Sequence, residues 1–133
     1  VDEISGTIRI IDYKTGRVEK KDLKLKLWED LSKDVKLDKV FQLLFYTYIY
    51  SNNEIKKLST IVPGIISFRN LSSGLLNLEL PEKDISGLEG LGKFESLLKS
   101  ILNDIFNSEI PFYQTEIIDN CKFCPFTSIC NRI

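Results

Sequence analysis

The chain has 133 residues, the usual size of one domain, and its 43% hydrophobic and 28% charged residues are typical of a globular fold. Its formal charge is −1, from 18 basic and 19 acidic side chains, so no overall positive field marks it as a nucleic-acid binder. It has no histidine, which excludes Ser-His-Asp catalysis, histidine-ligated zinc and an imidazole base from within the chain.

The sequence contains no methionine, and its first residues, Val-Asp-Glu-Ile, resemble the interior of a β-strand. We therefore expect a fragment of a longer protein. No leader of basic and then apolar residues opens it. Its uncharged stretch at residues 41–53 is too short to cross a bilayer. We therefore expect a cytoplasmic protein with no membrane partner.

The N-terminal residues predict two short strands joined by a hairpin. Residues 7–13 are a β-branched run bounded by turn residues, and residues 1–4 are a second apolar piece. Ser5-Gly6-Thr7 between them suits a three-residue loop. Leucines alternate with lysines over residues 22–28, but the residues that follow look helical, so this stretch is ambiguous.

The remainder predicts two helices and two further strands. Apolar side chains recur at helical spacing over residues 37–50, and again over residues 88–106. Residues 58–68 and 76–80 have strand character, although Pro63 favours an edge strand or a bulge. An irregular tail follows, and the order of elements predicts an α/β sandwich around one sheet.

Two carboxylates and a lysine are predicted to meet at the open end of the hairpin. With a three-residue loop, Asp2 lies opposite Ile10 and diagonal to Asp12, roughly 7–8 Å away. Asp12 and Lys14 are two apart and project from the same face. Two such carboxylates suit Mg²⁺ or Mn²⁺, and Lys14 can orient an attacking water. The alternative is that Asp12 and Lys14 are solvated residues before a turn. However, so apolar a strand is normally buried, and ionisable side chains in a buried strand favour a functional role.

A polar pair interrupts the apolar pattern of the helix predicted at residues 37–50. Gln42 and Tyr46 are four apart and share one stripe of that helix. A glutamine at the border of the stripe and a tyrosine at the edge of the core are the alternative to a functional pair.

Basic side chains gather after the first hairpin strand. Residues 9–26 hold seven basic and three acidic side chains, a local net charge of +4 that could attract a phosphate backbone without reading sequence. A solvated charged face is the alternative. The basic residues are Arg9, Lys14, Arg17, Lys20, Lys21, Lys24 and Lys26.

Three cysteines lie within the last 13 residues, as Cys121, Cys124 and Cys130. An odd number in one C-x2-C-x5-C segment argues against a disulfide framework and favours a metal or a cluster in a reducing compartment. Three thiolates are one ligand short of a tetrahedral site. One alternative is a zinc site in which Asp119 is the fourth ligand. The other is three cysteines that bind no metal.

Together these motifs resemble those of a nuclease family. Val1-Asp2-Glu3-Ile4, followed by Ile10-Ile11-Asp12-Tyr13-Lys14-Thr15-Gly16, is similar to the second and third motifs of the PD-(D/E)XK nuclease superfamily in its RecB-like branch. Gln42 to Tyr46 resembles the Q-x3-Y motif of that branch, with Lys39 three residues before it. The cysteine segment resembles the tail of AddB-type members, in which a fourth, upstream cysteine completes a 4Fe–4S cluster.

The resemblance implies a restriction-endonuclease-like fold, with a central mixed sheet flanked by helices. It implies a partial nuclease domain over residues 1–118 and a cysteine-rich tail over residues 119–133. The metal ligands it implies are Asp2, Asp12 and the carbonyl of Tyr13, with Lys14 positioning the water. Gln42 and Tyr46 would hold the strand, and the DNA contacts it implies are Lys39, Tyr46, Arg17, Lys20 and Lys21.

The resemblance also implies partners and a process. DNA ends or single strands would be the substrate, and a helicase subunit or domain the partner, in double-strand-break repair and recombination. A stand-alone CRISPR-associated RecB-like exonuclease and a non-catalytic DNA-binding or scaffolding module are the rival interpretations. In the family, a first helix with another metal ligand and the fourth cysteine precede these motifs, so we expect this fragment to be inactive or weak.

Overall fold

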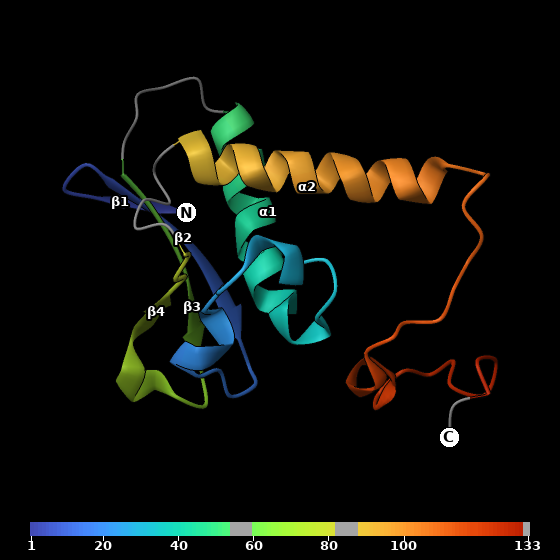
Figure 1. Ribbon diagram of the computed structural model, residues 1–133. Coiled ribbons are helices and arrows are strands. Elements are labelled where there is room, and N and C mark those ends of the chain that lie inside the picture. The colour runs from blue at the N-terminus through green and yellow to red at the C-terminus, as the bar shows by residue number, and fades with distance from the viewer. Residues whose placement is uncertain (54–59, 82–87, 132–133) are drawn as a thin grey trace.

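The computed structural model describes residues 1–53, 60–81 and 88–131 (Figure 1). The strands and α-helices are β1 (Asp2–Ile4), β2 (Thr7–Lys14), α1 (Asp38–Asn53), β3 (Thr60–Ser67), β4 (Leu75–Asn77) and α2 (Leu88–Phe106). Short 3₁₀ helices are η1 (Lys20–Leu23), η2 (Trp28–Asp30), η3 (Val35–Leu37), η4 (Leu71–Ser73) and η5 (Ile118–Cys121). Over the described ranges, no helix is long and apolar enough to span a bilayer.

The four strands form one mixed sheet in the order β1-β2-β3-β4. β1 and β2 are antiparallel, β2 and β3 are parallel, and β3 and β4 are antiparallel. α1 makes the crossover between the two parallel strands (Figure 1). The predicted α/β fold is therefore confirmed, and both predicted helices form within a few residues of their expected ends. Of the strand expected at 58–68, residues 58 and 59 lie outside the described ranges.

The hairpin between β1 and β2 is tighter than the sequence predicted. Ser5 and Gly6 both have positive φ, 52° and 78°, which is the two-residue turn whose twist matches the flanking strands. Ile4 consequently pairs with Thr7, and Asp2 pairs with Arg9. The predicted three-residue loop, with Asp2 opposite Ile10, is wrong. A shift of one residue moves each β1 side chain to the other face of the sheet.

Pro63 lies within an interior strand, so the predicted edge position is also wrong. β3 runs between β2 and β4, and Pro63 precedes the residues of β3 that pair with β4, which begin at Gly64. Its carbonyl accepts a hydrogen bond from the N–H of Leu78 at 2.9 Å. A proline is tolerated here because the regular ladder with β4 has already ended at this point.

The ambiguous residues 22–28 and the end of the strand expected at 76–80 lie against one another. Glu79 donates its N–H to the carbonyl of Leu23 and accepts from the N–H of Leu25, both at 2.9 Å. Neither segment continues as a regular strand, because a single bridge between Lys24 and Glu79 replaces a ladder. The pairing seats Leu23 and Leu25 in the core.

The hydrophobic core lies between the sheet and the helices. α1 packs on β2 and β3, and α2 crosses α1 (Figure 1). Phe94 of α2 is fully buried and meets the rings of Phe41 and Tyr48, with centroids 5.3 and 6.1 Å away. The clustered core residues are Val18, Leu23, Leu25, Leu31, Val40, Leu43, Leu44, Ile65, Leu76, Leu78 and Phe94.

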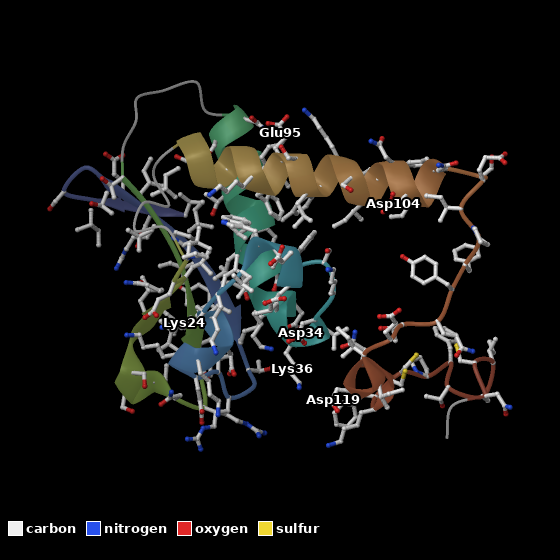
Figure 2. The ribbon with its side chains drawn as sticks, viewed as in Figure 1. Lys24, Asp34, Lys36, Glu95, Asp104 and Asp119 are labelled. Carbon is white, nitrogen blue, oxygen red and sulfur yellow. The ribbon has the colours of Figure 1, made fainter. Side chains whose placement is uncertain are left out.

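The tail returns to the loop that precedes α1. The C-terminal half of α2 projects beyond α1, and the chain then turns back (Figure 1). Lys36 Nζ lies 2.9 Å from Asp119 Oδ2, and the two side chains face each other in Figure 2. The Asn120 side chain donates to the carbonyl of Lys33 at 2.7 Å. The irregular tail is thus anchored at residues 119 and 120.

Candidate active site

β2 ends in two ionisable side chains that share one face of the sheet. Asp12 and Lys14 follow the buried Ile8 and Ile10 at a spacing of two, so they continue the face that α1 covers. Lys14 Nζ lies 3.0 Å from Asp12 Oδ2, and the two side chains are 30% and 16% exposed. An apolar strand therefore carries a carboxylate and an ammonium into a largely buried position.

Asp12 retains an unused buried acceptor. Its Oδ2 atom faces Lys14 at ion-pair distance, but the angles are not those of a hydrogen bond, and this buried oxygen accepts none in the described part of the chain. Buried polar oxygens normally have hydrogen-bond partners. A carboxylate oxygen that accepts no hydrogen bond is a suitable ligand for a hard divalent cation such as Mg²⁺.

The Tyr13 carbonyl faces the opposite direction from its neighbour in β2. The carbonyl of Lys14 accepts from the N–H of Phe68 at 2.9 Å, on the β3 side. Because successive backbone carbonyls alternate in direction along a strand, that of Tyr13 points to the β1 side. Over the described residues β1 pairs no further along β2 than Arg9, so this oxygen can serve as a second donor beside Asp12.

The structure does not bring Asp2 to Asp12. Asp2 is paired across the hairpin with Arg9, which lies an odd number of residues from Asp12 and so on the other face of the sheet. The Arg9 guanidinium donates to both carboxylate oxygens, and these hydrogen bonds hold the pKa of Asp2 below its usual range. Within the described ranges, no group of three or more His, Cys, Asp or Glu side chains could hold a metal.

α1 places the polar pair of the predicted motif against Lys14. Lys14 Nζ donates to Gln42 Oε1 at 2.6 Å, over a sequence separation of 28 residues. Gln42 Nε2 in turn donates to the Tyr46 hydroxyl at 2.7 Å. Four of the residues singled out from the sequence, Asp12, Lys14, Gln42 and Tyr46, therefore form one continuous chain of contacts.

The basic residues expected to bind DNA are mostly engaged with carboxylates. Lys39 pairs with Asp38 at 3.1 Å. Arg17 and Lys21 both pair with Glu19, while Lys20 and Lys24 both pair with Glu79. These contacts reduce the local positive charge that the sequence count suggested, although Arg17, Lys20 and Lys21 remain at least 70% exposed.

Sequence reasoning missed the serine that orders the segment after Lys14. Ser67 is fully buried, accepts from the N–H of Val18 at 3.2 Å and donates to the carbonyl of Gly16 at 2.8 Å. It stands directly across the parallel ladder from Lys14. A serine at the end of a β-branched strand gives no distinguishing signal, because its role depends on the loop that folds onto it.

An exposed aromatic pair on the other face of the sheet was also missed. The rings of Tyr13 and Phe68 stack with centroids 6.0 Å apart, and the residues are 59% and 53% exposed. Alternation along β2 could have placed Tyr13 on that face, but its partner Phe68 follows the end of β3 and is distant in the sequence.

The three cysteines lie in the anchored tail, each partly exposed and none in a disulfide. The fourth ligand considered for zinc, Asp119, is ion-paired with Lys36, and the hydrogen bond from that ammonium lowers the pKa of the carboxyl group. The described residues therefore hold the cysteine segment close to the loop before α1 without assembling a ligand set.

Comparisons with curated proteins and with solved structures gave no match. The family model of the PD-(D/E)XK nuclease superfamily matches residues 1–131. That match spans the hairpin, α1, the second pair of strands, α2 and the tail. It agrees with the α/β fold and its four-stranded mixed sheet. The chain belongs to the PD-(D/E)XK nuclease superfamily, whose members are metal-dependent nucleases.

Proposed function

We propose that this domain hydrolyses phosphodiester bonds in DNA, with residues Asp12 and Lys14 at the reaction centre. The observation that carries the proposal is the position of Lys14 Nζ, 3.0 Å from Asp12 and 2.6 Å from Gln42 at the end of a buried strand. Charged side chains are mostly exposed, whereas these two lie between the sheet and α1 and are only 30% and 16% exposed.

Asp12 and the Tyr13 carbonyl would hold Mg²⁺ or Mn²⁺, because Asp12 Oδ2 accepts no hydrogen bond in the described chain and the Tyr13 carbonyl points to the side of β2 beyond its pairing with β1. A bound divalent cation supplies a Lewis acid for the phosphate and lowers the pKa of water. Lys14 orients the attacking water and stabilises the negative charge that develops on the phosphate. Gln42 fixes the ammonium in place by accepting one of its hydrogen bonds.

We propose that the second carboxylate ligand of the metal is a residue other than Asp2. In the observed register the partners of Asp2, Glu3 and Ile4 are Arg9, Ile8 and Thr7. Extending the same register along β2 sets the residue two positions before Val1 opposite Asp12, and therefore on the same face. In a longer protein, as we propose for the parent of this chain, an acidic residue there would complete the site.

DNA contacts are proposed for the exposed basic residues around the end of β2. Arg17, Lys20 and Lys21 follow the strand that carries the reaction centre, and Lys39 lies one turn before Gln42 on α1. Each is paired with a carboxylate, so a DNA phosphate has to displace a salt bridge. Such contacts add attraction without base recognition and weaken with salt.

For the parent protein we propose an AddB-like or RecB-like helicase–nuclease that acts on DNA ends in double-strand-break repair, in the cytoplasm. The support is the C-x2-C-x5-C spacing of Cys121, Cys124 and Cys130 after a long helix, together with the Q-x3-Y pair on α1. In this proposal an upstream cysteine completes a 4Fe–4S cluster that staples the tail to the rest of the protein.

Cleavage of end-labelled DNA in Mg²⁺, compared with EDTA, tests the proposed reaction. We expect Mg²⁺-dependent cleavage by the full-length protein and its loss in Asp12→Asn and Lys14→Ala. Lys99→Ala removes an exposed lysine that pairs with Glu95 on α2 and is the matched control. Cleavage that survives in both site variants would refute the proposal.

A further inference from the structure

The apolar stripe of α2 continues beyond the core that this helix helps to form. Phe94 is fully buried, and Leu97 and Leu98 pack against the core. The following turns of the same stripe are exposed, Ile105 by 68% and Phe106 by 82%. Helices in proteins derive most of their stability from the packing of an apolar face. The last turns of α2 lack that packing within the described part of the chain.

The segment that follows α2 extends this apolar surface. Phe112 and Tyr113 are almost entirely exposed, and Ile110 is exposed as well. Together with the end of α2, these residues line a hollow of about 530 Å³. Residues 102–113 form what we call the overhang surface. Contiguous exposed apolar patches of this kind mark interaction sites, whereas scattered single apolar residues do not.

The charges of the overhang surface are all negative. Residues 100–121, which include it, contain four acidic residues and no lysine or arginine. Asp119 is paired with Lys36, but no ion pair joins the exposed Asp104, Glu109 or Glu116 to a cation in the described part of the chain. Asp104 lies on the part of α2 that projects beyond α1 (Figure 2). Negative charge around an apolar centre favours a basic protein partner and disfavours DNA or an anionic membrane.

A second copy of this chain is a poor occupant of the overhang surface. In a symmetric dimer the same patch meets itself, so acidic residues of both copies would face each other. Like charges that meet at an interface weaken binding. A head-to-tail contact would have to use exposed basic residues such as Arg17, Lys20 and Lys21, which are already paired with carboxylates.

We propose that the overhang surface binds a segment of another protein that has an apolar stripe flanked by lysine or arginine side chains, as on one face of an amphipathic helix. A large apolar side chain of the partner occupies the hollow beside Phe106 and Phe112. The basic side chains of the partner lie opposite Asp104, Glu109 and Glu116. An aromatic centre with a charged rim is the usual anatomy of a protein interface. This role is independent of the reaction proposed at the end of β2.

Two synthetic amphipathic peptides of about five helical turns provide the test. Both carry leucine at the spacing of one helix face. One has lysine at the flanking positions, and the other has glutamate at the same positions. Fluorescence anisotropy of the labelled peptides measures their binding to the 133-residue chain. We expect the lysine peptide to bind about 10- to 100-fold more tightly, because the glutamate peptide sets like charges against each other.

Substitutions in the chain separate the apolar contribution from the charged one. Phe106→Ser should weaken binding of the lysine peptide about 10- to 100-fold, the effect of losing one large apolar side chain from an interface. The double variant Asp104→Lys, Glu109→Lys should prefer the glutamate peptide, a gain of binding that unfolding cannot produce. Leu71→Ser and Glu3→Lys are the matched controls, because each changes an exposed side chain outside the overhang surface. Both controls should bind as the wild type does.

The proposal is overturned if the wild-type chain binds neither peptide or binds both equally. It is also overturned if Phe106→Ser has no effect or if the charge reversal leaves the preference unchanged. Sedimentation velocity tests the second copy, since a dimer that Phe106→Ser dissociates would assign the surface to self-association instead. Binding to the 133-residue chain but not to the full-length protein would mean that the parent covers this surface itself, which also overturns the proposal. None of these measurements includes cleavage, so their failure leaves the proposed function untouched.

Discussion

Arg9 lies directly across the hairpin from Asp2, and its guanidinium donates hydrogen bonds to both oxygens of that carboxylate. A two-point contact between paired strands opposes a slip in register, because any slip separates the partners. The Asp2 carboxylate is therefore engaged with Arg9 within the hairpin and lies on the face of the sheet opposite Lys14.

We predict that the Asp2 carboxyl group titrates below its usual range, near 3.9 in an unfolded chain, and that Arg9→Gln returns its pKa toward that value. Since the folded pKa is lowered, the ion pair stabilises the hairpin above the unfolded pKa and is lost as pH falls through the folded value. NMR titration of the side-chain carboxyl carbons measures the pKa of Asp2 in the wild-type protein and in the Arg9→Gln variant. Asp119, which is paired with Lys36, should remain lowered in the Arg9→Gln variant. An Asp2 pKa unchanged by Arg9→Gln would contradict the contact.

Lys14→Ala should lower kcat for DNA cleavage about 10²- to 10³-fold, the usual effect of removing one group that stabilises charge in the transition state. DNA binding and any ATP-driven unwinding by the full-length protein should change little, because Lys14 acts on the attacking water and the developing charge. Steady-state cleavage and equilibrium binding, measured on the same substrate, separate the two effects. Equal losses of binding and cleavage would mean that Lys14 is only a phosphate contact.

Ser67→Ala should reduce the free energy of unfolding by about 1–3 kcal/mol, because the buried N–H of Val18 and carbonyl of Gly16 each lose their partner. Denaturant unfolding provides the value. Ser96→Ala, which removes an exposed hydroxyl bonded to the Gly92 carbonyl, should cost much less. Equal effects of the two substitutions would show that Ser67 does not order the segment after Lys14.

If the cysteines hold a cluster, the full-length protein purified without oxygen should be brown and contain about four irons per chain. Changing Cys121, Cys124 or Cys130 to serine should bleach it and lower its melting temperature, since the staple on the tail is lost. The 133-residue chain should purify colourless. Stoichiometric zinc without iron in the full-length protein would replace the cluster with a structural zinc site.

Local patterns predicted the elements of this fold well. The apolar stripes of α1 and α2 and the β-branched run of β2 have the periods of their structures, so their positions follow from the sequence. The same holds for Asp12 and Lys14, whose spacing of two places them on one face. Gln42 could be tied to Lys14 only by resemblance, because 28 residues separate them.

Register and strand order depended on features that periodicity does not contain. One residue more or fewer in the Ser5–Gly6 turn decides which face Asp2 occupies, and both turn lengths suit this sequence. Pro63 is tolerated in an interior strand because the regular ladder between β3 and β4 does not include it. Beyond that ladder, Glu79 pairs with Leu23 and Leu25 instead. Local sequence patterns do not predict tertiary contacts of this kind.

The central claim, a divalent-cation site at Asp12, is tested most directly by titrating the chain with Mn²⁺ and recording the broadening of its backbone NMR signals. We predict weak binding, with broadening centred on residues 12–14 and reaching Gln42. Asp12→Asn should abolish this broadening and Asp2→Asn should leave it in place. Broadening centred elsewhere in the chain, or unchanged by Asp12→Asn, would contradict the account.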